Sequence, residues 1–244
     1  MAETGHIKNV ENLGIARDFG TSWGAAYVPS NPNLAIAAMT AAVGNGEGEI
    51  DGVQTSKTPY RNATAACDDA FAPLSKLVTR VMRAMSAQGI PQSVIDDANT
   101  YARKIKGQRK TPAKVDDPST PGVDESQASH SAAQMSRSQR MENFESLRLL
   151  LESQALYTPN ENDLKIITLA TYLADLEAKT AAVGTTFVPY SNAMASRDDV
   201  LYINDDSIVK IGKLFKLYVQ AAFGRDSTEW NQVKGLEFKD LRRK

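Results

Sequence analysis

The residues of this chain best suited to chemistry form two similar groups of asparagine and aspartate. Both groups belong to the pattern Pro-Tyr-x-Asn-Ala-x-Ala-x-x-Asp-Asp, found at residues 59–69 and again at 189–199. In each pattern the asparagine and the second aspartate are seven positions apart, which places them on one face of a helix. Such a face could hold a cation or a polar partner, or it could tie helix ends to loops by side-chain hydrogen bonds. The candidate residues are Asn62, Asp68, Asp69, Asn192, Asp198 and Asp199.

Other chemistries are poorly supported by the residues present. The two histidines, His6 and His130, are expected in an N-terminal tail and a polar linker, so neither a Glu-x-x-His metal site nor a histidine-activated nucleophile is expected. The single cysteine, Cys67, excludes an internal disulfide and a cysteine-based zinc cluster. The acidic, glycine-rich run 44–52 lacks the residue order of a calcium-binding EF-hand loop. We therefore expect no catalytic residue, no metal and no cofactor, and a protein that is not an enzyme.

The elements that carry these groups occur twice in the chain. Shifting the sequence by 130 residues aligns positions 27–71 with 157–201 without a gap. Fourteen of the 45 pairs are identical, against about three expected from ordinary residue frequencies. A shift of 134 also aligns Asn9 and Leu13 with Asn143 and Leu147. The sequence therefore predicts a tandem duplication, with one repeat in residues 1–107 and the other in 140–244.

Apolar residues at helical spacing fill both predicted repeats, and no β alternation is clear. Prolines mark the expected helix starts at Pro32, Pro59, Pro73 and Pro91 in the first repeat, and at Pro159 and Pro189 in the second. Another helix is expected after Asp206-Ser207, ending near Gly224. The fold class is therefore all-α, with each repeat a unit of three or four helices and the two packed as pseudo-twofold bundles.

One segment conflicts with this regularity. Residues 44–52 contain four glycines, each of which costs roughly 1 kcal/mol relative to alanine inside a helix. The counterpart, residues 174–182, contains neither glycine nor proline. Because the prolines at 29 and 59 are spaced like those at 159 and 189, we interpret the glycine segment as a weak or locally unwound helix rather than a loop.

Between the repeats, residues 108–139 have the polar, Pro-, Ser- and Gln-rich composition of a linker. A linker of this length allows the repeats to pack together, to separate or to embrace a neighbouring chain. Basic residues lead into it and also end the chain, and could contact phosphate groups, although solvated surface charge is the simpler interpretation. They are Arg103, Lys104, Lys106, Arg109, Lys110 and Lys114, and then Lys239, Arg242, Arg243 and Lys244.

The overall composition is that of a globular protein, with 42% hydrophobic residues and a formal net charge of −1. Neither a signal peptide nor an apolar stretch long enough to span a membrane is evident, so we expect a cytoplasmic protein with no membrane partner.

The second repeat, from Tyr157-Thr158-Pro159-Asn160 through Pro189-Tyr190-Ser191-Asn192-Ala193 to Phe223-Gly224, resembles a group of duplicated helical bacterial proteins without an assigned activity. The resemblance covers both repeats but not the linker, and the first repeat departs from it in the glycine segment. It implies the fold and the duplication and no site residues. From the duplication and the long linker we expect a structural or self-assembling protein, a subunit of a homo-oligomer or filament. The alternative is a module that binds nucleic acid or a ribonucleoprotein through the basic clusters.

Overall fold

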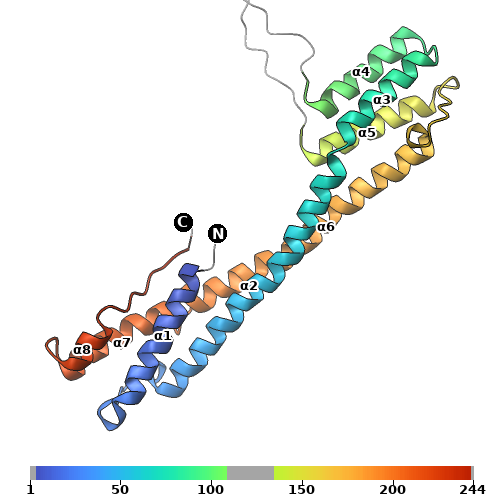
Figure 1. Cartoon of the computed structure of the whole chain (residues 1–244). Coiled ribbons are helices and arrows are strands. Elements are labelled where there is room, and N and C mark those ends of the chain that lie inside the picture. Colours follow the sequence, from blue (N-terminus) through green and yellow to red (C-terminus); the bar gives the residue numbers. More distant parts are fainter. Residues whose placement is uncertain (1–3, 109–134, 243–244) are drawn as a thin grey trace, which may run out of the picture. The chain divides into compact units, whose positions relative to one another are not determined.

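The computed structural model describes residues 4–108 and 135–242, and every regular element in that part of the chain is a helix or a helical turn (Figure 1). The long helices are α1 (Thr4–Ser22), α2 (Ile36–Phe71), α3 (Leu74–Ala87), α4 (Gln92–Lys106), α5 (Arg137–Glu152), α6 (Ile166–Asp198) and α7 (Ile208–Phe223). The short elements are the 3-10 turns η1 (Gly24–Ala26), η2 (Pro32–Leu34) and η3 (Asn162–Leu164), the π-helical turn η4 (Asp199–Ile203), and α8 (Thr228–Val233). The prediction of an all-helical, multi-helix fold is confirmed.

The chain divides into two compact units that do not follow the predicted repeats. Unit 1 consists of residues 1–61 and 185–244, and unit 2 consists of residues 62–184. The helices α2 and α6 each contribute residues to both units. Each unit therefore combines the first part of one predicted repeat with the last part of the other.

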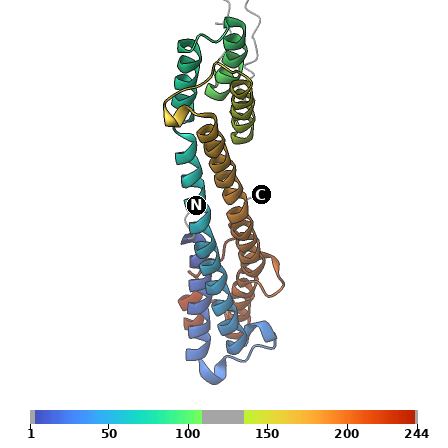
Figure 2. The ribbon, with the colours of Figure 1, turned by 90° about the vertical axis from the view of Figure 1, so that its right-hand side faces the viewer.

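Unit 1 is built around α1, which packs against α7, with the first half of α2 alongside (Figures 1 and 2). The turn η4 and the short helix α8 also contact α7. Apolar residues four or three positions apart on α7 face the interior, as expected for an amphipathic helix. The fully buried side chains of this core include Leu13, Met39, Leu201, Ile208, Phe215 and Val219.

Unit 2 is built around α4, which packs against both α3 and α5 (Figure 1). The end of α2 and the start of α6 complete its core. Helix α3 is strongly amphipathic, because Leu74, Val78, Val81 and Met85 recur on one face. The fully buried side chains of this core also include Ile105, Phe144, Leu147, Leu169 and Leu176.

Short polar residues and glycine set several helix ends. Ser136 and Ser227 cap α5 and α8, because each side chain accepts a hydrogen bond from the backbone N–H three residues later. Gly107 ends α4 in the left-handed conformation with φ of 68°. The predicted helices after Pro73 and Pro91, and the one ending near Gly224, are confirmed.

The expectation that Pro59 and Pro189 open new helices is wrong. Both prolines lie inside continuous helices, α2 and α6. A proline in a helix interior removes one hydrogen bond and costs about 3 kcal/mol, whereas a proline in the first turn costs little. Sequence patterns alone therefore predict that a helix starts at the proline. Burial offsets this cost in α2, where Val53 before the proline and Cys67 after it are both fully buried. The Ser56 hydroxyl also donates to the Gly52 carbonyl oxygen at 2.8 Å in the turn before Pro59.

The glycine segment 44–52 is helical, as predicted, but it is not unwound. It lies within α2, and one of its glycines has a packing role. A β-carbon at Gly46 would overlap the Ile208 side chain and lie 3.0 Å from Val10 Cγ2, whereas one at Gly44, Gly48 or Gly52 would meet nothing within 4 Å. Gly46 therefore allows α2 to approach the core of unit 1 closely.

The predicted linker ends earlier than expected, because α5 already begins at Arg137. Residues 109–134, which include His130, Arg109, Lys110 and Lys114, lie outside the described residues. The two described ends of this segment meet, since a β-carbon at Gly107 would lie 2.6 Å from Met135 Sδ.

Candidate functional site

The predicted Asn/Asp groups fall in different compact units. Asn62, Asp68 and Asp69 lie near the end of α2 in unit 2, and all three are exposed. Asp68 forms an ion pair with Arg137 at the start of α5, with Asp68 Oδ1 2.6 Å from Arg137 Nη2. Exposed pairs of this kind contribute about 0.2–1 kcal/mol. The contact joins two segments of unit 2 at its surface.

The second group lies in unit 1, where α6 passes into η4. Asn192 and Asp199 are exposed, and Asp198 is half-buried beside Arg197, whose Nη2 lies 2.7 Å from Asp198 Oδ1. Arg197 occupies the position that corresponds to Cys67 at the 130-residue spacing, and both side chains are buried. Within the described residues, no group of three His, Cys, Asp or Glu side chains could hold a metal ion.

The expectation that His6 lies in a tail outside the core is wrong. His6 belongs to α1, is 8% exposed, and its Nδ1 lies 2.7 Å from the hydroxyl oxygen of Tyr202 on η4. The Asn9 amide nitrogen donates to the same hydroxyl at 3.4 Å. Burial raises the pKa of Tyr202 to about 12, so the phenol stays protonated near neutral pH. The π-helical turn thus connects to α1 through a buried polar contact.

We define the C-terminal tail as residues 234–242. The tail lies against α1, and side chains of α1 bind its backbone. Asn9 pairs with both backbone polar groups of Lys239: its amide nitrogen donates to the carbonyl oxygen at 2.8 Å, and its amide oxygen accepts from the N–H at 3.0 Å. One turn later, the Asn12 amide nitrogen donates to the Glu237 carbonyl oxygen at 2.8 Å. Both asparagines are almost fully buried. The tail therefore runs antiparallel to α1 with its backbone bound by two asparagine side chains.

The tail lies in a groove between α1 and α7. We call this surface the tail groove and define it by Asn9, Asn12, Gly212 and Lys216. The Lys216 ammonium group donates to the carbonyl oxygens of Lys234 and Leu236, both at 2.8 Å. The Phe238 ring is buried directly over Gly212, where a β-carbon would overlap it. Gly212 thus creates the recess that accepts the tail's aromatic residue.

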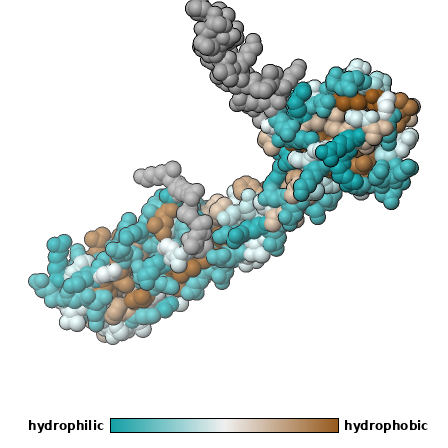
Figure 3. Space-filling view, turned by 45° about the horizontal axis from the view of Figure 1, so that its top comes forward, coloured by the Kyte–Doolittle hydropathy of each residue, from teal (hydrophilic) through white to brown (hydrophobic). Residues whose placement is uncertain are grey.

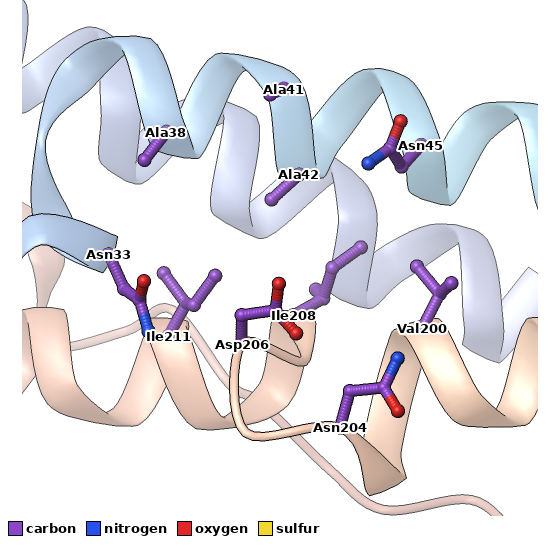
Figure 4. Close-up of a pocket in the computed structure, with 10 residues that line it drawn as sticks. All are labelled: Asn33, Ala38, Ala41, Ala42, Asn45, Val200, Asn204, Asp206, Ile208 and Ile211. Carbon is purple, nitrogen blue, oxygen red and sulfur yellow. The ribbon is translucent and has the colours of Figure 1, made fainter.

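A separate pocket of about 280 Å³ lies in unit 1 between α2 and the start of α7 (Figure 4). Its apolar walls come from small residues of α2 and from Ile208 and Ile211, and the Asp206 carboxylate lies between those walls. The small residues of α2 are Ala38, Ala41 and Ala42, and the other lining residues are Asn33, Asn45, Val200 and Asn204. Its polar groups come from exposed or half-buried residues, so the pocket is open to solvent.

The described basic residues differ in their surroundings. Arg103, Lys104 and Lys106 lie in the last turn of α4. In the tail, Lys239 pairs with Glu237, and Arg242 pairs with Asp240 while its guanidinium lies 6.0 Å from the centre of the Tyr202 ring. Arg243 and Lys244 lie outside the described residues.

Sequence reasoning missed the tail groove. Two signals could have indicated it: asparagines one turn apart on an otherwise apolar helix face, and the alternation of Leu236 and Phe238 with charged residues. Neither signal shows that the two segments meet, because they are separated by more than two hundred residues.

Comparison with protein-family models, with curated proteins and with solved structures finds no match for this chain. No described helix combines the length and the apolar content needed to cross a membrane.

Proposed function

We propose that this chain is a non-enzymatic structural protein, built by tandem duplication, that assembles with copies of itself. The observation that carries the proposal is the composition of the compact units. Each unit is completed by segments far apart in the sequence: unit 1 by residues 1–61 with 185–244, and the described part of unit 2 by residues 62–108 with 135–184. The two segments of a unit are held to each other by non-covalent packing. The same packing can form between a segment of one copy and a segment of a second copy, which is a low-cost route to assembly.

Matching contacts at a spacing of 130 residues support the duplication. The Tyr27 hydroxyl donates to the Leu34 carbonyl oxygen at 2.7 Å, and the Tyr157 hydroxyl donates to the Leu164 carbonyl oxygen at 3.0 Å. In the same loops, the backbone N–H of Val28 donates to the Tyr218 hydroxyl, and that of Thr158 donates to the Gln88 side-chain oxygen. The same spacing relates buried residues of α3 to those of α7, namely Val78 to Ile208, Val81 to Ile211 and Met85 to Phe215.

Exposed apolar side chains support contact with other copies. Leu214, Leu217 and Ala221 follow one another at helical spacing on the outer face of α7, and Leu217 is 61% exposed. Val28 in unit 1 and Ile167 in unit 2 are 74% and 73% exposed. Figure 3 shows hydrophobic areas among hydrophilic ones on both units. Apolar surface of this kind is stabilised by burial in a contact between molecules.

The test is the mass of the full chain in solution. Light scattering coupled to size-exclusion chromatography, over a wide range of protein concentration and salt, should detect species larger than one chain, and electron microscopy should show whether they are closed or extended. The double variant Leu214→Gln with Leu217→Gln removes exposed apolar side chains from α7, so it should reduce association while the helix content stays the same. A strict monomer at every concentration and salt would rule out the proposal. Cell fractionation would test the expected cytoplasmic location.

A second candidate function is binding to a nucleic acid or ribonucleoprotein, favoured by positive charge at one end of α4. Arg103, Lys104 and Lys106 all lie in the last turn of this helix, so their positive charges gather at one end. Phosphate contacts are strongest at low salt. Binding of a labelled oligonucleotide should therefore appear at low salt and weaken steeply as salt rises. No affinity at low salt would eliminate this candidate.

A further inference from the structure

The tail groove holds its occupant in a way that does not depend on most of the occupant's side chains. Asn9, Asn12 and Lys216 together make five hydrogen bonds to the tail, and all five go to its backbone atoms. Main-chain hydrogen bonds to an extended segment give affinity, and a side-chain pocket gives specificity, as in other grooves that recognise extended peptides. Here the recess over Gly212 is that pocket, and Phe238 fills it.

The side chains of the tail alternate as a bound extended peptide requires. Leu236 and Phe238 point toward the core of unit 1, while Glu237 and Lys239 are exposed. Residues 236–242 nevertheless form neither a helix nor a strand. The tail is therefore a ligand-like segment, and the groove binds backbone groups of Lys234, Leu236, Glu237 and Lys239.

The elements that follow α3 in unit 2 and α7 in unit 1 differ in length. After α3 the chain forms the full helix α4, which buries Ile95, Ala98, Ala102 and Ile105. After α7 the chain forms only the short α8 and the tail, whose buried apolar side chains are Val233 and Phe238. The tail is thus held more by polar contacts, and with less apolar burial, than the helix in the corresponding place.

We propose that the tail groove recognises residues 234–242 of a second copy of this chain, so that copies assemble by exchanging their tails. This proposal rests on the proposed function and names one contact through which copies associate. The partner is a second copy because the tail sequence is the one shown to fit the recess and the asparagine pair, and every copy carries it. Gly235, the second residue of the tail, supplies a point close to α8 where the chain can turn away.

The groove is tested with the full chain carrying Phe238→Ala, which loosens its own tail, and a fluorescently labelled peptide of residues 234–244. Circular dichroism first establishes that the variant is folded; if it is not, Phe238→Leu replaces it. We expect a saturable rise in fluorescence anisotropy. A peptide with alanine in place of the phenylalanine should bind at least about tenfold more weakly, because it lacks the anchor. Adding Gly212→Ala to the receptor should abolish binding because the new methyl group fills the recess. No binding to a folded receptor would overturn the proposal.

The exchange itself is tested by the mass of the wild-type chain. Phe238→Ala should lower the associated fraction, and an excess of the unlabelled peptide should lower it for the wild-type chain. Association that is unchanged by both would overturn tail exchange while leaving self-assembly intact. A wild-type chain that is monomeric at every concentration would instead refute self-assembly. It would also refute a second copy as the occupant of the groove, even if the peptide binds. The anisotropy and mass measurements therefore separate failure of the groove from failure of the proposed function.

Discussion

Tyr60 and Tyr190 stack on each other in unit 1, with ring centroids 5.5 Å apart and ring planes inclined by 17°. The two residues are 130 positions apart, so each tyrosine contacts its own counterpart in the proposed repeat. Each also directly follows a proline that lies inside a long helix. Contact between a residue and its counterpart is characteristic of elements related by a twofold axis, as in a symmetric dimer. The proposed duplication thus gains support from a packing contact as well as from sequence identity.

We expect the two tyrosines to be energetically coupled. Tyr60→Ala, Tyr190→Ala and the double variant, compared by urea unfolding in a double-mutant cycle, should give a coupling free energy of about 0.5–1.5 kcal/mol, as found for aromatic pairs. Tyr60→Phe and Tyr190→Phe are the matched controls, because they keep both rings and should retain most of the stability. Additive effects of the two alanine substitutions would show that the stacked rings do not stabilise the fold.

We also expect the chain to stay together after it is cut between the repeats. A protease site placed in residues 109–134 separates two fragments that each contribute to both compact units. The buried cores of both units should therefore hold the fragments together. The cut protein should elute from a size-exclusion column at the volume of the uncut protein, and the fragments should separate only in denaturant. Separation under native conditions would contradict the observed composition of the units.

The positions of most helices could be predicted from the sequence because local patterns determine them. Apolar residues at helical spacing after Pro73 predict α3, and the glycine at 224 marks the end of α7. The same local rules failed at Pro59 and Pro189, which both lie inside continuous helices. In α2 the buried side chains of Val53 and Cys67, on either side of Pro59, help to offset the lost hydrogen bond. Local rules predict a helix boundary correctly unless tertiary packing stabilises the helix by more than an unfavourable residue costs.

The division into units could not be predicted from the same patterns. A repeat that folds on itself and one that exchanges halves with its neighbour bury the same apolar faces, so periodicity does not distinguish them. The buried position of His6 was missed for a related reason. His6 is near the start of the chain, and its partner Tyr202 lies 196 residues away. Only a contact between distant segments reveals that His6 is buried.

The glycines of α2 should respond differently to substitution. Gly48→Ala should raise the free energy of unfolding by about 0.5–1 kcal/mol, because alanine favours the helix and its methyl group meets nothing within 4 Å. Gly46→Ala should lose this gain or destabilise the protein, because the new methyl group overlaps the fully buried Ile208 side chain. Thermal and urea unfolding of the two variants provide the measurement. Equal stabilisation by both would show that α2 does not need the glycine at 46.

Alkaline pH should destabilise unit 1 through Tyr202. Its pKa is raised to about 12 by burial, above the unfolded value of about 10, so the folded state retains a proton that the unfolded state loses. The stability from this group is therefore complete below pH 10 and falls as the pH rises from 10 toward 12, by at most about 1.4 kcal/mol per pH unit. Urea unfolding at pH 8 and pH 11 should show a smaller fall for Tyr202→Phe than for the wild type. This variant should also be less stable at pH 8, because His6 loses its hydroxyl partner. Tyr101→Phe, which removes a hydroxyl elsewhere, is the matched control, and equal falls in Tyr202→Phe and the wild type would exclude Tyr202 as the source.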